Sequence, residues 1–322
     1  MTDKLSQDST LLLNCFTGDP DLTRWILKHT VDDSCNSYIR QGEIDVVNIC
    51  RNNGVSPLVI ACEYHHTEIV EMLLEYKADI NKCRDSGVSP LYIACQNGYL
   101  DIVLQLLDKN INTDVNKCRD DGASPLYVAC QKGYLAIVLQ LLDKKVNTDV
   151  NNCVDNGASP LYIACQNGHL DIVLQLLDKK VNIDVNKCID SGESPLYIAC
   201  QNGHDKIVKI LLTHGADINK SRNTSYSPLH IACHSNHIDV VVELLKVQNP
   251  KVDIDLCDSK GCTSLFFACE KGYTNIARKH LEHHADPHWC SKKGHSPFTV
   301  AQEAGFKEIL DIIEQHNSHE IP

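Results

Sequence analysis

Cysteine is the residue type that most clearly could do chemistry in this chain, because thiolates act as nucleophiles and metal ligands. The 322 residues include 17 cysteines, most of which fall into two regular columns. The first column follows an alanine: Cys62, Cys95, Cys130, Cys165, Cys200, Cys233 and Cys269. The second stands between repeating segments: Cys50, Cys83, Cys118, Cys153, Cys188, Cys257 and Cys290. Elements stacked at about 8–10 Å would keep the members of a column beyond disulfide reach. We therefore expect reduced, mostly buried thiols.

Histidine supplies a second candidate for chemistry, in the segment HLEHHADPHWC, which contains His280, His283, His284, His288 and Cys290. His280 and His284 are four residues apart, a spacing that can place two metal ligands on one helix face. His284, however, occupies the position that Gly215 holds in an earlier segment, at the end of a helix. We therefore expect a solvated helix terminus and no metal site.

The familiar catalytic motifs are missing from the sequence. It has no glycine-rich phosphate loop, no nucleophile elbow and no metalloprotease helix pattern, so we expect no enzyme activity and no cofactor. The formal charge of −12 argues against a nucleic-acid partner, because such binding depends on clustered Lys and Arg. Neutral to basic protein partners are favoured.

No part of the chain predicts membrane insertion or secretion. No stretch approaches the roughly 18 consecutive apolar residues that a membrane span needs. The first residues, MTDKLSQDSTLLLNC, lack the long apolar region of a secretory signal. We expect a cytoplasmic protein.

The elements that position these residues are revealed by an internal repeat. Proline recurs in steps of 33 to 36 residues, with serine once in its place, at Pro57, Pro90, Pro125, Pro160, Pro195, Pro228, Ser264 and Pro297. A period of this size is typical of a solenoid. Segments 122–156 and 157–191 differ at only 8 of 35 positions, which fits either recent duplication or a partner that repeats at the same pitch.

Residues 87–121 illustrate what each repeat should form. Gly87 suits a tight turn, Ser89 can cap a helix, and Pro90 fits the first helical position. A short apolar helix would end at Gly98, and LDIVLQLLD would follow as an amphipathic second helix. A helix pair of this kind cannot bury its apolar faces alone, so the repeats must stack.

The repeat resembles the ankyrin repeat. Residues 54–81, GVSPLVIACEYHHTEIVEMLLEYKADIN, and 192–219, GESPLYIACQNGHDKIVKILLTHGADIN, are similar to that family's signature almost throughout. The resemblance implies an all-α ankyrin-repeat solenoid of about nine repeats, forming a single domain over 1–322. We expect an N-terminal capping repeat at 5–50 with an insert at 31–43, seven internal repeats at 54–293, and a C-terminal capping repeat at 294–318. Both ends should present a polar outer face.

The chain departs from the family pattern in a regular way. Tyrosine replaces histidine at Tyr92, Tyr127, Tyr162 and Tyr197, and we expect each ring to fill the volume of the histidine, with exposure to a partner as the alternative. Ser225 replaces the turn glycine and Ser264 replaces the helix-opening proline, which predicts weaker joints across 221–290 than across 87–200.

Three second helices carry leucine where the family has a charged residue, at Leu104, Leu139 and Leu174. The same repeats have longer loops that bring Ile111, Val146 and Val181. Our hypothesis is that each loop aliphatic folds back over its leucine. Leucines open to solvent would instead favour a binding surface.

The resemblance implies a partner surface made by the turn tips and the exposed edge of the first helices. Its positions here are Asp85, Ser86, Val88, Gln96, Asn97, Asp120, Asp121, Ala123, Gln131, Lys132, Asp155, Asn156, Ala158, Gln166, Asn167, Asp190, Ser191, Glu193, Gln201 and Asn202. The amides could bind the backbone of an extended peptide, and the carboxylates could favour Lys or Arg beside it.

The sequence thus predicts a non-catalytic scaffold that binds a protein or peptide. The alternatives are an adaptor or host-directed effector that recruits a target to ubiquitin machinery, and a thiol-rich metal or redox protein with exposed cysteines. Asn81 and Asn219 resemble asparagines that are hydroxylated in ankyrin repeats, although we favour a structural role for each within its turn.

Overall fold

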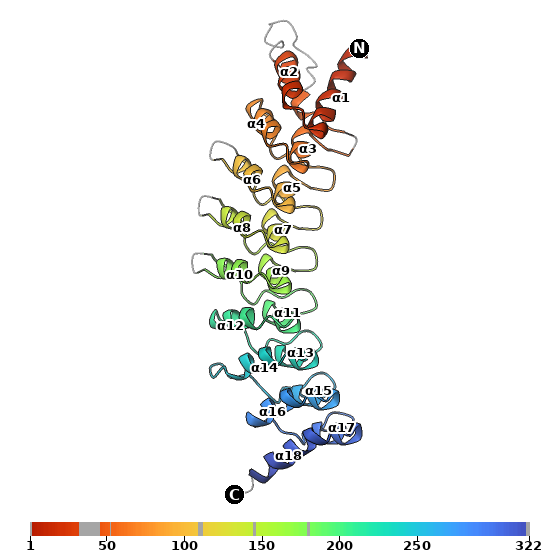
Figure 1. Ribbon diagram of the computed structural model, residues 1–322, viewed down its shortest axis with the longest axis vertical. Helices are drawn as coiled ribbons and strands as arrows, with labels where there is room; N and C mark the ends of the chain where they lie inside the picture. The colour runs from red at the N-terminus through yellow and green to blue at the C-terminus, as the bar shows by residue number, and fades with distance from the viewer. Residues whose placement is uncertain are drawn as a thin grey trace. The chain divides into compact units, whose positions relative to one another are not determined.

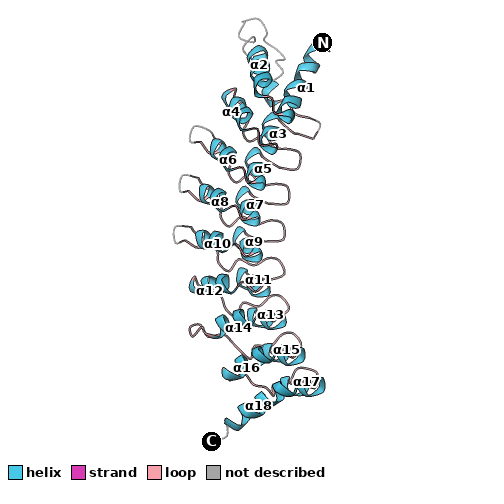
Figure 2. Cartoon of the chain, in the orientation of Figure 1, coloured by secondary structure: helices cyan, strands magenta, loops and turns pink. Residues whose placement is uncertain are grey.

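The computed structural model describes residues 2–31, 46–51, 53–108, 112–143, 146–178 and 181–319. These ranges hold eighteen α-helices and no β-strand, apart from an isolated antiparallel bridge between Gln248 and Lys251. The helices follow one another as nine pairs (Figure 2). In the described part of the chain, the prediction of an all-helical fold with about nine repeats is confirmed.

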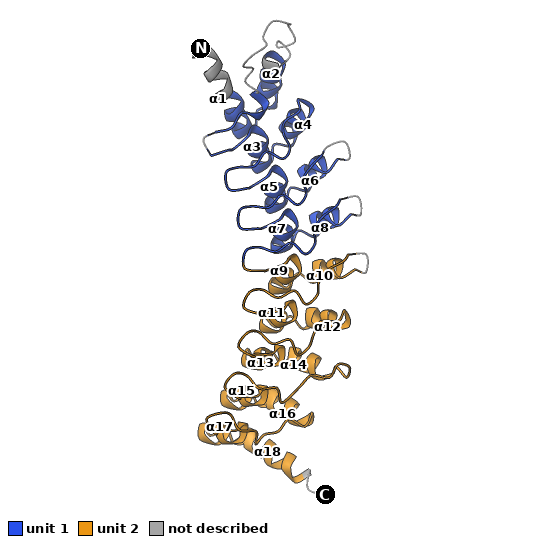
Figure 3. Cartoon of the chain, turned by 180° about the vertical axis from the view of Figure 1, so that it is seen from behind, with its two compact units in different colours: residues 1–155 blue, residues 156–322 orange. Residues whose placement is uncertain are grey.

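The chain divides into two compact units, residues 1–155 and residues 156–322 (Figure 3). The first contains α1 (Thr2–Thr17), α2 (Pro20–Val31), the 3₁₀-helix η2 (Val46–Asn48), α3 (Pro57–Glu63), α4 (Thr67–Glu75), α5 (Pro90–Asn97), α6 (Leu100–Leu106), α7 (Pro125–Lys132) and α8 (Leu135–Leu141). The second contains α9 (Pro160–Asn167), α10 (Leu170–Leu176), α11 (Pro195–Gln201), α12 (Asp205–Thr213), α13 (Pro228–His234), α14 (Ile238–Leu245), α15 (Ser264–Lys271), α16 (Thr274–Glu282), α17 (Pro297–Ala304) and α18 (Lys307–His319). Apart from Val31, the insert expected at 31–43 lies outside the described residues.

Within each unit the pairs stack so that like helices contact one another (Figure 1). In the first unit the first helices pack in the order α1, α3, α5 and α7, and the second helices in the order α2, α4, α6 and α8. In the second unit the two rows run from α9 to α17 and from α10 to α18. Each pair thereby buries the apolar faces that it could not bury alone.

The first helices begin and end where the sequence predicts. In α5, the hydroxyl of Ser89 accepts a hydrogen bond from the backbone N–H of Tyr92 at 3.0 Å, and Pro90 occupies the first turn. Gly98 ends the helix with φ of 83°, in the left-handed region that costs glycine least. Serine or threonine caps the other first helices from α3 to α17 in the same way, through Ser56, Ser124, Ser159, Ser194, Ser227, Thr263 and Ser296.

The two helices of a pair bury different amounts of their surface. Every residue of α5 from Pro90 to Cys95 is buried, whereas α6 buries only one face, through Ile102, Val103 and Leu106. Removing a Leu or Ile side chain from water contributes about 1.5–3 kcal/mol. The first helices therefore form the centre of the stack, and the second helices cover it on one side.

The turns between repeats form a backbone ladder of their own. The N–H of Asp120 donates to the carbonyl of Ser86 at 3.1 Å, and the N–H of Asp190 donates to that of Asn156 at 2.9 Å. A Cβ at Gly87 would lie 2.7 Å from Oδ1 of Asp120, so this close approach requires glycine. Ser225 takes the same left-handed conformation, with φ of 61°, as its place in the repeat predicts.

The outer face of the first helix pair contradicts the expectation of polar ends. Leu13 is 55% exposed, Leu22 40% and Trp25 56%, and Phe16 is also exposed. The signal was present in the sequence. Aligning Gly18 with Gly98 places Leu13 and Leu22 at the positions of Ile93 and Ile102, which are interior positions and not cap positions.

Candidate functional site

Most of the predicted partner-binding residues lie at the surface of their unit. Exposed are Asp85, Ser86, Asp120, Gln131, Lys132, Asp155, Asn156, Gln166, Asn167, Asp190, Ser191 and Asn202; half-buried are Gln96, Asn97, Asp121, Glu193 and Gln201. We call these residues the turn face. Val88, Ala123 and Ala158 do not belong to it, because they are at most 8% exposed. These three residues directly precede the capping serines, and they are buried together with those serines.

Some of the asparagines of the turn face have structural bonds. The side-chain amide of Asn97 donates to the carbonyl of Glu63 at 3.3 Å, and that of Asn202 donates to the carbonyl of Gln166 at 2.7 Å. Each bond links the end of one first helix to the end of the preceding one. These asparagines therefore help to hold the stack together, and Gln96 and Gln201 beside them remain candidates for contact with a ligand.

The acidic residues of the turn face also differ among themselves. Asp121 accepts hydrogen bonds from the guanidinium of Arg119, with Nε at 2.9 Å, and from the backbone N–H of Ala123. The hydrogen bond from Arg119 lowers the pKa of Asp121. Asp85 and Asp120 instead lie at the exposed tips of the turns, each with its carboxylate close to the turn glycine of the preceding repeat, Gly54 or Gly87. The tips therefore present carboxylates that a basic ligand can reach.

The tyrosines of the first helices are core residues. Tyr92, Tyr127, Tyr162 and Tyr197 are at most 9% exposed, so the expectation that each ring fills interior volume is confirmed. The guanidinium of Arg119 lies over the ring of Tyr92, 5.6 Å from its centroid, and the hydroxyl of Tyr162 donates to Glu193 at 3.2 Å. Tyr92 and Tyr162 thus connect their first helices to the turn of the next repeat.

On the side of the loops, asparagine side chains bridge consecutive repeats. The amide of Asn81 donates to the carbonyl of Asn112 at 2.9 Å, and its oxygen accepts from the N–H of Asp114 at 2.8 Å. Asn219 makes the same two bonds, to Lys251 at 3.3 Å and from Asp253 at 2.9 Å. The expected structural role is therefore observed, but each side chain bonds to the next repeat and not within its own turn.

The second cysteine column has a function that the sequence did not suggest. The thiols of Cys83 and Cys118 donate to the carbonyls of Asn81 and Asn116 at 3.4 and 3.2 Å, which holds the turn around each bridging asparagine. Ser221 stands in the same column, and its hydroxyl makes the same bond to Asn219 at 3.3 Å. The serine in this cysteine column indicates from the sequence that the position needs a hydrogen-bond donor.

Burial opposes the activation of several thiols. Burial raises the pKa of Cys83, Cys118 and Cys188, and it raises the pKa of Cys15 to about 12. A protonated thiol is a poor nucleophile and a poor metal ligand. All cysteines in the described residues are free thiols, and Cys290 is the most open of them.

The side chain of His280 is buried, whereas that of His284 is exposed. His280 is fully buried in α16, where its Nδ1 donates to the carbonyl of Ile276 at 2.9 Å. Its Nε2 lies 3.0 Å from the hydroxyl of Ser264 and 3.5 Å from the thiol of Cys233, whereas His284 is exposed. Burial lowers the pKa of His280 to about 4. In the part of the chain that the structure describes, no three side chains of metal-binding type gather at one place.

The hypothesis that loop aliphatics cover the exposed leucines is wrong. Leu104 is 48% exposed, Leu139 43% and Leu174 41%, while Ile111 lies outside the described residues. The loops are held elsewhere: the hydroxyl of Thr148 donates to the carbonyl of Leu141 at 2.6 Å, and Thr113 makes the corresponding bond to Leu106. These bonds hold Thr113 and Thr148 to the ends of their own helices. The third loop has Ile183 at the threonine position, yet Leu174 is exposed to a similar degree.

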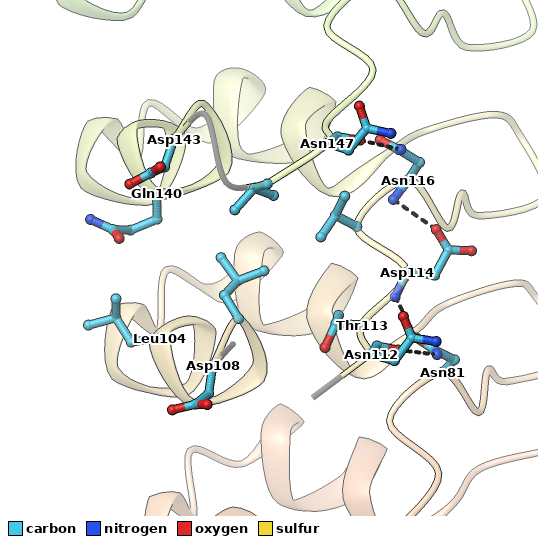
Figure 4. A pocket seen from close by; sticks show the side chains of 13 residues that line it. Asn81, Leu104, Asp108, Asn112, Thr113, Asp114, Asn116, Gln140, Asp143 and Asn147 are labelled. Carbon is cyan, nitrogen blue, oxygen red and sulfur yellow. Dashed lines mark hydrogen bonds between the residues drawn. The ribbon is translucent and has the colours of Figure 1, made fainter. Parts of the chain in front are cut away.

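Leu104 and Val146 instead line a hollow in the first unit (Figure 4). It has a volume of about 680 Å³ and is bounded by the ends of α6 and α8, the loops that follow them and the asparagine bridge of Asn81. Its lining mixes apolar side chains with carboxylates such as Asp114 and Asp143. This hollow is a second candidate surface, on the opposite side of the repeats from the turn face.

Two further observations do not depend on a particular site. None of the described helices is long and apolar enough to cross a membrane. The family model described as "Ankyrin repeats (3 copies)" matches residues 11–117, 110–187, 181–253 and 229–320. A segment of 62 residues is 37% identical to the "Ankyrin repeat and KH domain-containing protein mask-1" of Caenorhabditis elegans, covering 19% of this chain and 2% of that protein.

Proposed function

Because the chain belongs to the ankyrin-repeat family, whose members generally mediate protein–protein interactions, we propose that it is a non-catalytic scaffold that binds a protein or extended peptide on its turn face. The observation that supports this surface most is its repetition. In the first unit, consecutive repeats present glutamine at the end of the first helix and aspartate at the turn tip: Gln96 with Asp120, and Gln131 with Asp155. In the second unit Gln166 stands with Asp190, and Gln201 with Asn223. A ligand in extended conformation would meet similar pairs of polar groups in successive repeats.

The chemistry of these groups favours a neutral to basic ligand. A glutamine side chain can both donate to and accept from a peptide backbone. The exposed carboxylates at the tips attract Lys or Arg side chains, and the formal charge of −12 would speed the approach of a basic partner. The shortage of basic side chains on the turn face, where Lys132 stands beside several carboxylates, opposes a nucleic-acid ligand.

The cytoplasm is the compartment that suits such a scaffold. Its many free thiols would stay reduced there, and the buried column needs no oxidation to pack. Hydroxylation of Asn81 or Asn219 would act on a residue that already bridges two repeats. Intact mass of the corresponding peptides from native cells would detect the added oxygen.

The proposal can be tested with two matched pairs of substitutions in the first unit. Gln96→Arg with Gln131→Arg adds two positive charges to the turn face, whereas Leu104→Arg with Leu139→Arg adds two on the side of the hollow. Partners captured from lysate by the native protein would be identified by mass spectrometry, and their binding to both variants would then be measured by calorimetry. All four side chains reach solvent, so both variants should fold, which circular dichroism would check.

We expect only the turn-face variant to lose its partner, by at least about tenfold in Kd. Loss only in the leucine variant would place the binding surface at the hollow and contradict the proposal. Equal loss in both would show that added charge, and not a defined surface, controls binding. The equivalent change in the second unit, Gln166→Arg with Gln201→Arg, would show whether that unit contributes.

A further inference from the structure

The outer face of the first helix pair is built from the residue types that the other pairs bury. Counting back five residues from the residue that ends each first helix in a left-handed conformation leads to Leu13, Ile60, Ile93 and Val128. The last three are at most 5% exposed, whereas Leu13 is 55% exposed. What differs is that no described helix pair precedes α1 and α2.

The second helices repeat this relationship. Leu22 in α2 corresponds to Ile69, Ile102 and Ile137, which are at most 1% exposed. Leu22 is 40% exposed and Trp25, beside it, is 56% exposed. Exposed large apolar side chains that gather at one place on a protein surface mark an interaction site. Leu13 and Leu22 occupy the positions that the later pairs of this unit bury.

Charged side chains flank the apolar residues of α2 in an ordered way. At about 100° per residue, Asp21, Leu22, Lys28 and His29 all lie within about 60° of the direction of Trp25. All five side chains are exposed, with the acidic one in the first turn and the basic ones in the last turn. The ring of His29 stacks on Trp25 at a centroid distance of 4.5 Å. We call Leu13 and these five residues the end face.

This pattern is complementary to itself. If two copies of α2 pack antiparallel, with the two Trp25 rings near the two-fold axis, Asp21 of each copy comes opposite Lys28 and His29 of the other. The apolar centre then meets an identical apolar centre. Two-fold symmetric contacts of this kind are the commonest form of association between identical chains.

The neighbouring charges do not disturb this arrangement. Arg24 turns toward the next repeat, where it pairs with Glu68 at 2.8 Å. Oδ1 of Asp19 accepts from the backbone N–H of Leu22 at 3.0 Å and so caps the helix. Both groups are engaged within their own copy.

The opposite end of the chain fits the end face poorly. The last described helix, α18, exposes Lys307, Asp311 and Glu314, while Glu308 pairs with Arg278 of the preceding repeat. Head-to-tail association would bring these charges against Leu13 and Trp25, where they would lose water without gaining partners. The self-complementary pairing avoids this cost.

We propose that two copies of this chain associate through their end faces, with α2 antiparallel to α2 of the second copy. The resulting assembly would carry two turn faces, so a partner with two binding segments would gain from both. The association itself does not depend on whether the turn face binds a ligand.

Sedimentation equilibrium on the full chain, from about 1 to about 100 µM, measures this association directly. The expected species has twice the 35.9 kDa of the single chain. Leu22→Asn with Trp25→Gln should shift it to the single chain. The matched control, Leu104→Asn with Leu139→Gln, alters equally exposed apolar residues elsewhere and should leave the dimer unchanged.

A charge exchange tests the antiparallel arrangement. Asp21→Lys alone and Lys28→Asp alone place like charges opposite each other, and each should weaken self-association by at least about tenfold. In an equimolar mixture, each copy of the first variant meets one of the second with opposite charges, and the dimer should return. Circular dichroism would establish that every variant remains folded.

Several outcomes would overturn the proposal. A chain that stays monomeric at the highest concentration contradicts it. In a Trp289→Phe variant, strong shielding of Trp25 from a fluorescence quencher would then show that another segment of the same chain covers the end face. A dimer that survives Leu22→Asn with Trp25→Gln places the contact elsewhere. A mixture of charge variants that fails to restore the dimer refutes the antiparallel geometry.

Discussion

Replacing His280 with leucine should make the C-terminal repeats resistant to acid. The imidazole is fully buried in α16, at a position where the preceding second helices of the same unit carry Leu211 and Leu244. After its removal the hydroxyl of Ser264 still bonds to the carbonyl of Ile254 at 3.3 Å, and the thiol of Cys233, which loses the imidazole, still has a hydrogen bond with Ser264. Leucine should therefore fit the site.

The magnitude follows from the pKa. Burial lowers the pKa of His280 from its ordinary value of 6.5 to about 4. Below pH 6.5 the unfolded chain takes up a proton that the folded chain takes up only near pH 4, so acidification favours unfolding across this interval. The stability lost is about 2 kcal/mol at pH 5 and about 3 kcal/mol once the pH is below both values.

The assay needs a probe in the same repeats, because stacked repeats can unfold regionally. The chain has two tryptophans, and Trp289 lies in the segment between α16 and α17. In a Trp25→Phe background, its fluorescence would report urea unfolding of this region at pH 7.5 and at pH 5.0. We expect the drop in unfolding free energy between the two conditions to be smaller by about 2 kcal/mol in His280→Leu.

His230 is a second buried histidine whose pKa burial lowers, and it is present in both proteins, so its contribution cancels in the comparison. If His280→Leu and its parent lose the same stability on acidification, the buried imidazole is not an acid-sensitive group and the reasoning fails.

Three further predictions concern the joints between repeats. Asn116→Ala removes two bonds to the next loop, at 2.8 and 2.7 Å, and should lower the unfolding free energy by about 1–3 kcal/mol in urea titrations, whereas an unchanged value would show that the bridge is dispensable. Ser225→Gly relieves a φ of 61° and should stabilise by about 1 kcal/mol; hydrogen exchange should then rise in protection across 221–290, which we expect to be less protected than 87–200 in the native chain. Cys118→Ser keeps the donor and should be nearly neutral in thermal melts, while Cys118→Ala should lower Tm by several degrees.

The sequence predicted the helices and turns within each repeat, but it did not predict the hydrogen bonds between neighbouring repeats. The capping serines and the glycine at 98 act through their own helix, so the local pattern suffices to place them. The amide of Asn81 acts 31 residues away, on Asn112, and no local pattern indicates that distance.

The exposed leucines show a second limit. The exposure of Leu139 depends on contacts of the following loop that the local pattern does not indicate, such as the bond from the hydroxyl of Thr148 to the carbonyl of Leu141. On the turn face, the sequence identified the exposed glutamines and aspartates, but it assigned Val88 and Ala123 to the surface because it could not show that they follow the capping serines into the core.

The asparagine bridge makes the length of a loop irrelevant to the register of the repeats. In the second unit, Asn186 bonds to the carbonyl of Gly215 and the N–H of Asp217, and Asn219 bonds to the same pair of backbone groups at Lys251 and Asp253. The loop that bonds to Asn186 follows the end of α12 at Thr213, and the loop that bonds to Asn219 follows the end of α14 at Leu245. The second of these loops is longer by four residues, yet both make the same two bonds to an asparagine.

The number of residues between the second helix and the bonds to the asparagine can thus vary, whereas these bonds are kept. An engineer could therefore graft a peptide epitope between Leu245 and Lys251 without reshaping the repeats on either side, provided that Asn219 and Asp253 stay in place. Evolution has the same freedom, which allows repeats of 33 and 35 residues to be exchanged within one array.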